Sequence, residues 1–177
     1  MGANEQGADA THGRWLTIPR TLCFVRFDGA GGDVDVLLMK RATHKRVFPN
    51  RYNGVGGHIE RDEDPLTSAR REILEETGLG VRDLRLRAVY NIDAGAETGI
   101  VLFVFTAWSD TREVVANSEG TLHWLPRSEV VALGDQLVED LPHLLPRILT
   151  MPDDAPPLFV HVSYDASDAI LMRFAGE

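Results

Sequence analysis

The sequence predicts an α/β fold in which a mixed β-sheet lies between helices. Two observations carry this prediction. Runs of β-branched and aromatic residues, bounded by turns rich in glycine and aspartate, recur in both halves of the chain and are typical of strands. Between these runs lie one long helical pattern with clear start and stop residues, and two shorter helical patterns. The expected order is therefore hairpin, glycine loop, helix, strands, helices and a terminal hairpin.

The N-terminal part opens with a polar segment followed by a hairpin. Residues 1–16 are mostly small and polar, so we expect a flexible arm there. A single domain is expected over residues 17–177, since 44% apolar content suffices for one core. The runs Thr21–Phe27 and Val34–Lys40 flank a glycine-rich turn and predict a β-hairpin.

The central helix has the clearest local signals. Asp64 is a suitable N-cap, and Pro65 fits the first helical position because its missing N–H would be unpaired there. Gly78 supplies the left-handed residue that ends a helix. Small or apolar side chains recur at a spacing of three or four and predict one buried face. They are Leu66, Ala69, Ile73 and Thr77.

Three acids share one face of this helix. Glu72, Glu75 and Glu76 stand at i, i+3 and i+4. Residues 59–76 contain seven acids but only three arginines, so the segment is negatively charged. A hard cation such as Mg²⁺, which prefers oxygen ligands, would relieve their repulsion. A solvated, salt-bridged surface face is the other interpretation, and the triplet alone does not separate the two.

The rest of the chain predicts further strands and two helices. We expect strands at Leu84–Ile92, Ile100–Trp108 and Thr121–Leu125, and a closing hairpin at Leu158–Tyr164 and Ala169–Phe174. Helices are expected at Pro126–Leu133 and Glu139–Leu149.

Charge and composition exclude several classes of partner. A net charge of −9 argues against binding to a nucleic acid polymer or to an anionic membrane. The single cysteine, Cys23, cannot form an internal disulfide, and no apolar run approaches the length of a membrane span. We therefore expect a cytoplasmic protein.

The spacing across residues 57–79 resembles the Nudix box at every defined position. Gly57 is followed after five residues by Glu63, and after seven more by the run Arg71–Leu79, REILEETGL. This resemblance implies an α/β/α sandwich with a loop–helix–loop motif. It also implies a divalent metal, Mg²⁺ or Mn²⁺, held against a nucleoside diphosphate linked to another group.

Matched position by position, the resemblance assigns roles within the box. Glu72, Glu75 and Glu76 become the expected metal-site carboxylates. Gly57 would offer its backbone carbonyl to the metal, and Glu63 and Arg71 would hold the glutamates in place.

Outside the box, the chain is similar to the oxidised-purine nucleoside triphosphatases of the 8-oxo-dGTPase type. The segment Tyr52–Gly57, YNGVGG, parallels their glycine loop, which implies that Asn53 contacts the base. Glu139 and Asp140 fall where those enzymes carry two adjacent acids facing the purine, although both are also typical acids of a helix start. Leu137 stands in place of a base-stacking tryptophan.

Two other residues are candidates for the site. Arg41 closes a strand directed toward the box and begins a basic segment, which is either a phosphate-facing rim or a solvated loop. Glu119 precedes a strand that carries Trp124, as in the late Nudix segment; it is an extra metal ligand, a general base or a plain turn acid.

Together these features predict a metal-dependent hydrolase that cleaves a phosphoanhydride bond of a nucleoside triphosphate or nucleoside diphosphate derivative. An oxidised purine dNTP is one expected substrate. Two alternatives remain: a Nudix-fold sensor that binds nucleotides without turnover, and a hydrolase of another conjugate such as ADP-ribose.

Overall fold

The computed structural model describes residues 13–29, 32–115 and 118–177. The predicted arm over residues 1–16 falls mostly outside them, and Leu16 already belongs to the first strand, where it pairs with Thr98. The strands are β1 (Leu16–Asp28), β2 (Val34–Arg41), β3 (Tyr52–Asn53), β4 (Val81–Ile92), β5 (Thr98–Ser109), β6 (Gly120–Pro126), β7 (Leu158–Tyr164) and β8 (Ile170–Phe174). The helices are α1 (Pro65–Thr77), α2 (Arg127–Ala132), the 3₁₀ turn η3 (Gly134–Gln136) and α3 (Leu141–Ile148).

The described residues form one mixed sheet of eight strands. Its order is β3-β2-β1-β5-β4-β7-β8, and β6 pairs with β2 on a separate branch. The β1–β5 and β4–β7 pairs are parallel, whereas the other pairs are antiparallel. The predicted mixed sheet is therefore confirmed.

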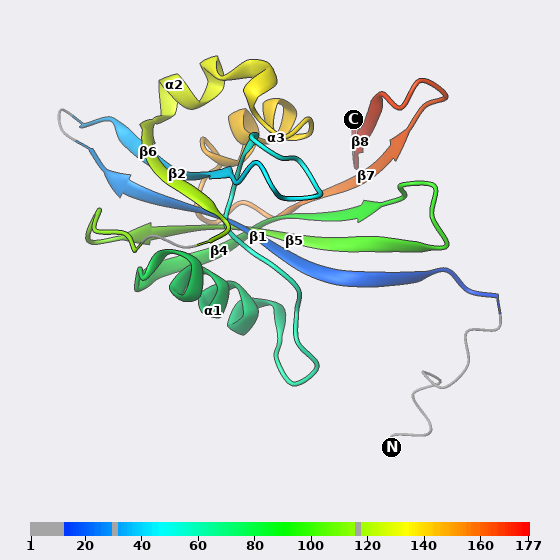
Figure 1. The fold of residues 1–177 in the computed structure, drawn as a ribbon, viewed down its shortest axis with the longest axis horizontal. Helices are drawn as coiled ribbons and strands as arrows, with labels where there is room; N and C mark the ends of the chain where they lie inside the picture. The colour runs from blue at the N-terminus through cyan, green and yellow to red at the C-terminus, as the bar shows by residue number, and fades with distance from the viewer. Residues whose placement is uncertain (1–12, 30–31, 116–117) are drawn as a thin grey trace.

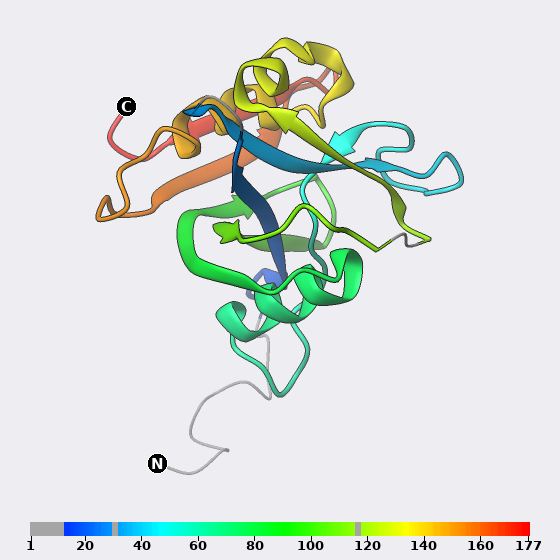
Figure 2. The same cartoon turned by 90° about the vertical axis from the view of Figure 1, so that its left-hand side faces the viewer.

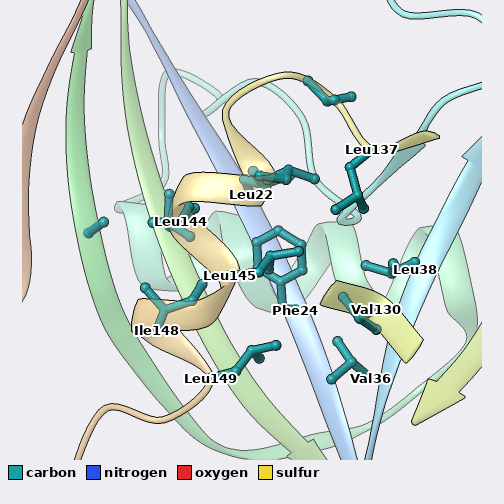
Figure 3. Packing of buried hydrophobic residues seen from close by; sticks show 14 of the residues in the cluster. Leu22, Phe24, Val36, Leu38, Val130, Leu137, Leu144, Leu145, Ile148 and Leu149 are labelled. Atoms are coloured by element: carbon teal, nitrogen blue, oxygen red, sulfur yellow. The ribbon is translucent and has the colours of Figure 1, made fainter. Parts of the chain in front are cut away.

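Helices cover both faces of this sheet. Helix α1 packs on one face and α2 with α3 on the other (Figures 1 and 2). Because side chains alternate along a strand, β1 serves both cores. Leu22 and Phe24 pack with α3, as Figure 3 shows, while Cys23 and Val25 pack with Ile73 of α1. The predicted α/β/α sandwich is confirmed.

Helix α1 begins and ends where the sequence predicts. The Asp64 side chain accepts hydrogen bonds from the backbone N–H groups of Leu66 and Thr67, and Gly78 has a φ of 76°. The predicted buried face is wrong at one position, because Leu66 is 43% exposed. Ser68 is buried in the first turns instead, and its hydroxyl lies 3.4 Å from the His58 carbonyl oxygen.

Candidate active site

A pocket of about 500 Å³ is lined by residues of β1, β2, β4, β5, β7, β8 and α1, by the glycine loop, and by the segments just before β6 and α3. Eight of its ionisable side chains fall into two sets, and within each set the charge of one group shifts the pKa of another. One set is Glu72, Glu76, Glu119 and Arg41, which we call the acidic end. The other is Tyr90, Tyr164, Glu139 and Asp140, which we call the base end. Apolar side chains also line the pocket: Leu22, Val47, Phe48, Ile92, Ile100, Leu102, Val138, Val162 and Ile170.

The glycine loop is fixed to β1 by backbone hydrogen bonds. Thr21 donates to the Gly57 carbonyl at 2.9 Å, and Cys23 and Val55 exchange bonds of 2.7 and 3.1 Å. Gly56 has a φ of 149°, and a Cβ there would overlap the Thr21 carbonyl oxygen. A Cβ at Gly57 would instead overlap the carboxylate of Glu72. Glycine is required at both positions, but for different reasons.

This difference gives a first prediction. In Gly57→Ala the obstacle is the end of a flexible side chain, so the fold should survive while the Glu72 carboxylate moves. We expect kcat to fall about 10- to 100-fold, because misplaced site groups are costly. In Gly56→Ala the obstacle is backbone, and stability should fall by roughly 2 kcal/mol or more. Thermal unfolding and steady-state kinetics of the pair test this; unchanged kcat in Gly57→Ala would contradict it.

Arg71 joins the acids of the box. Its Nε and Nη2 donate to the two carboxylate oxygens of Glu63 at 3.0 and 2.6 Å. Its Nη1 donates to Glu72 at 2.9 Å and to Glu75 at 3.1 Å. The bonds from Arg71, followed by the Glu60 backbone N–H, lower the pKa of Glu63 to about 2. Such geometry suits residues that hold the glutamates in place.

The three glutamates of α1 lie in different surroundings. Glu76 accepts a 3.0 Å hydrogen bond from the Gly56 N–H, and burial, with added repulsion from Glu72 and Glu119, raises its pKa to about 7. Burial also raises the pKa of Glu72. Glu75 differs, because its side chain is 59% exposed and it does not line the pocket. The acidic end therefore contains Glu72 and Glu76, whereas Glu75 faces Arg71 and solvent.

The chemistry of this donor set fits a hard divalent cation. Glu72, Glu76 and Glu119 supply carboxylate oxygens, and the raised pKa values of Glu72 and Glu76 reflect burial and repulsion that a cation would offset. Within the described residues, no three side chains of His, Cys, Asp or Glu stand close enough together to hold an ion as arranged. Arg71 Nη1 pairs with both Glu72 and Glu75. A cation could bind these two carboxylates together only if the side chains of Arg71, Glu72 and Glu75 rotated.

The other candidates from the sequence all line the pocket. Arg41 does so while its Nε donates to the Val47 carbonyl at 2.9 Å, and Glu119 does so while paired with Lys45. Asn53 lies in the wall, with its Oδ1 accepting from the Gly54 N–H at 2.9 Å.

The acids at the start of α3 belong to the base end. Glu139 and Asp140 both line the pocket. Asp140 is the N-cap residue of α3, yet its side chain makes no capping hydrogen bond. Burial, with a smaller contribution from Glu139, raises its pKa to about 6. The geometry thus favours a pocket-facing role over a capping role. Leu137, by contrast, is 1% exposed and belongs to the core.

Sequence reasoning did not single out several pocket residues, among them Arg20, Thr21 and Tyr90. A signal existed for Arg20, since it stands in phase with Leu22 and Phe24 on the inward face of β1, where a charged residue is unusual. Thr21 and Tyr90 fit any buried strand, and nothing in the sequence separates them from core residues.

A family model described as NUDIX domain matches residues 17–148. A MutT protein of Bacillus halodurans superposes with a TM-score of 0.68 at 25% identity, covering 90% of this chain and 99% of that one. The NUDIX domain of Shewanella oneidensis NrtR, solved with ADP ribose, gives 0.64 at 18% identity over 82% and 96%, which shows a shared fold alone.

A sequence relative is similar over a shorter stretch. The m7GpppN-mRNA hydrolase NUDT17 of Danio rerio is 50% identical over 46 residues, which are 26% of this chain and 15% of that protein. The chain thus spans a small part of that relative's length. Separately, none of the helices in the described residues is long and apolar enough to cross a membrane.

Proposed function

The chain belongs to the Nudix family of pyrophosphohydrolases, and from this premise we propose that it uses Mg²⁺ or Mn²⁺ to hydrolyse a purine nucleoside triphosphate, including the oxidised purine form. The observation that carries the proposal is that one pocket is lined both by carboxylates of the box and by the two acids at the start of α3. The carboxylates of the acidic end suit a metal and phosphates, and the rest of the pocket lining combines apolar side chains with a few polar groups, as in small-molecule sites.

At the acidic end, the residues would act on the phosphates and on the attacking water. Glu72, Glu76 and the Gly57 carbonyl would hold a divalent cation, which would neutralise phosphoryl charge and activate water. Water would attack a phosphorus of the α–β phosphoanhydride, and the P–O bond of that anhydride would break to release the monophosphate and pyrophosphate. Arg20 and Arg41 line the same pocket, and their mutual repulsion adds to burial in lowering the pKa of Arg20. A polyphosphate would relieve this repulsion. Glu119, which lines the same pocket, would take the proton from water.

Glu75 needs a separate role in this scheme. Because it lies outside the pocket lining and bonds Arg71, we propose that it joins the metal site once Arg71 is displaced toward Glu63. At the base end, Asn53, Glu139 and Asp140 would face the purine.

A hydrolysis screen tests the function. The products are separated by anion-exchange chromatography and quantified, with Mg²⁺ and with Mn²⁺, for the common triphosphates, 8-oxo-dGTP, ADP-ribose and a capped dinucleotide. We expect a purine triphosphate to be cleaved to its monophosphate and pyrophosphate. Preferred cleavage of ADP-ribose would support the conjugate alternative, and binding without cleavage would support the sensor alternative.

Asp140→Asn tests the base end. If Asp140 faces the purine, KM for the preferred purine should be higher in this variant than in wild type. The kcat/KM of wild type should also change near pH 6, where Asp140 titrates, and the variant should lack this change. Burial raises the pKa of Asp140 from 3.8 to about 6 in the folded state. The contribution of this carboxyl to the free energy of unfolding is therefore complete below about pH 3.8 and is lost as pH rises through about 6. The variant should therefore gain about 1–3 kcal/mol at pH 7. Asp135→Asn, an exposed carboxylate outside the pocket, is the matched control. An unchanged ranking of nucleotides would refute the assignment.

A further inference from the structure

The pocket contains buried polar atoms that the protein leaves without partners. In the described part of the chain, five buried side-chain nitrogen or oxygen atoms have no hydrogen-bond partner: Arg20 Nε, Thr21 Oγ1, Arg26 Nε, Arg26 Nη2 and Tyr90 Oη. Arg20, Thr21 and Tyr90 line the pocket. Buried polar groups are almost always paired in folded proteins, so an unpaired group on a residue that lines a cavity points to a partner in the ligand.

Tyr90 is the sharpest of these cases. It lies on β4 with 1% of its surface exposed and belongs to the core cluster under α3. Its ring is thus fixed by packing, and its hydroxyl is the one part of the side chain that the packing does not satisfy. Phenylalanine would fill the same space without the cost of an unpaired hydroxyl, so packing alone does not account for tyrosine.

The surroundings of this hydroxyl indicate what it would contact. Burial raises the pKa of Tyr90, and the charge of Asp140 raises it further, so the hydroxyl stays protonated and can donate. Glu139 and Asp140 likewise add to the effect of burial on the pKa of Tyr164. Since Asp140 and Tyr90 both line the pocket and the Tyr90 hydroxyl has no partner, a ligand in this pocket would meet both side chains. The Tyr90 hydroxyl can donate a hydrogen bond, and the Asp140 carboxylate can accept one. This pair suits a heteroaromatic ring in which a hydrogen-bond acceptor stands next to an N–H group.

We propose that Tyr90 is a specificity-determining residue whose hydroxyl donates a hydrogen bond to a carbonyl or ring nitrogen of the substrate's base, next to an N–H that Asp140 accepts. The inference rests on the proposed function and extends it, because it gives a role to a base-end residue that lies outside every motif of the sequence. A site built to hydrogen-bond one group rejects ligands that lack it.

Tyr90→Phe removes this hydroxyl and nothing else. We expect an unfolding temperature equal to or above that of wild type without ligand, because the lost group had no partner. KM for the preferred nucleotide should rise roughly 5- to 10-fold, the value of one hydrogen bond, with kcat unchanged. Deoxyribose 5′-triphosphate, which has no base, should be processed equally by both proteins. Tyr52→Phe, outside the pocket lining, is the matched control.

Binding separates this inference from the proposed function. Calorimetric titration of metal-free protein with nucleoside monophosphates needs no turnover, so it tests Tyr90 even if no triphosphate is cleaved. Tighter binding to wild type than to Tyr90→Phe, with non-additive losses in the Tyr90→Phe, Asp140→Asn double variant, supports the shared contact. Equal binding to both proteins, or absence of nucleotide binding by wild type, overturns it. A lower unfolding temperature for Tyr90→Phe with an unchanged KM would show a structural hydroxyl and overturn it as well.

Discussion

Glu76→Gln is expected to lower kcat by about a hundredfold or more while the protein stays folded. The carboxylate lies at the acidic end beside Glu72 and Glu119, and its Oε2 accepts from the Gly56 N–H. Glutamine retains the shape and one acceptor oxygen but loses the charge that a divalent cation needs, and such electrostatic contributions to phosphoryl transfer are large. Kinetics at saturating Mg²⁺ measure the loss.

The same substitution should stabilise the metal-free protein at alkaline pH. The pKa of Glu76 is raised from 4.5 to about 7 in the folded state. Its contribution to stability is therefore complete below about pH 4.5 and is lost as pH rises through about 7. At pH 8 in a chelator, Glu76→Gln should gain about 1–3 kcal/mol in the free energy of unfolding, and the gain should vanish near pH 4.

The control for both measurements is Glu97→Gln, since Glu97 is exposed in the turn between β4 and β5. It should change neither kcat nor the dependence of stability on pH. Near-normal turnover of Glu76→Gln would remove Glu76 from the metal site. A pH-independent difference in stability would show that its carboxyl is not desolvated in solution.

Arg71→Lys is expected to have the second largest effect, with turnover reduced about 10- to 100-fold, as for other residues that orient metal ligands. Lysine keeps the charge but cannot reproduce the planar fork that reaches both oxygens of Glu63 while also bonding Glu72 and Glu75. Kinetics over a range of Mg²⁺ concentrations should show a lower kcat, and half-maximal turnover should require a higher Mg²⁺ concentration.

Acid titration provides an independent test of the same pair. The lowered pKa of Glu63 contributes stability above its unfolded value of 4.5, and this contribution is lost as pH falls toward about 2. Arg71→Lys should therefore unfold at a higher pH than wild type. Arg70→Lys, one residue away and exposed, is the control. If Arg71→Lys matches wild type in turnover and in acid unfolding, the hydrogen bonds from Arg71 to the glutamates contribute neither to catalysis nor to stability.

Local signals explain why so much of the fold could be predicted. The limits of α1 are set by Asp64, Pro65 and Gly78, all of which act on their immediate neighbours. Strand limits depend instead on distant partners. β1 begins at Leu16, before the predicted Thr21, because its N-terminal half pairs with β5 in parallel. Nothing within residues 16–20 reveals that partner.

The candidate site shows the same division. Box residues such as Glu72 and Glu76 follow from spacing along one helix, which the structure places on the pocket. Exposure of Glu75 does not follow from spacing, because it depends on where Arg71 directs its fork. The role of Tyr90 is hidden further, since a lone unpaired hydroxyl can be recognised only after every neighbour is placed.

The parallel pairing of β7 with β4 sets the order in which the pocket can be completed during synthesis on the ribosome. Every residue of the acidic end precedes β7 in the chain, but Val162, Tyr164 and Ile170 of the pocket wall come from β7 and β8. Strands that join distant segments form late, because closing long loops is slow. A nascent chain would therefore carry the complete box before the part of the pocket wall that β7 and β8 supply has been synthesised.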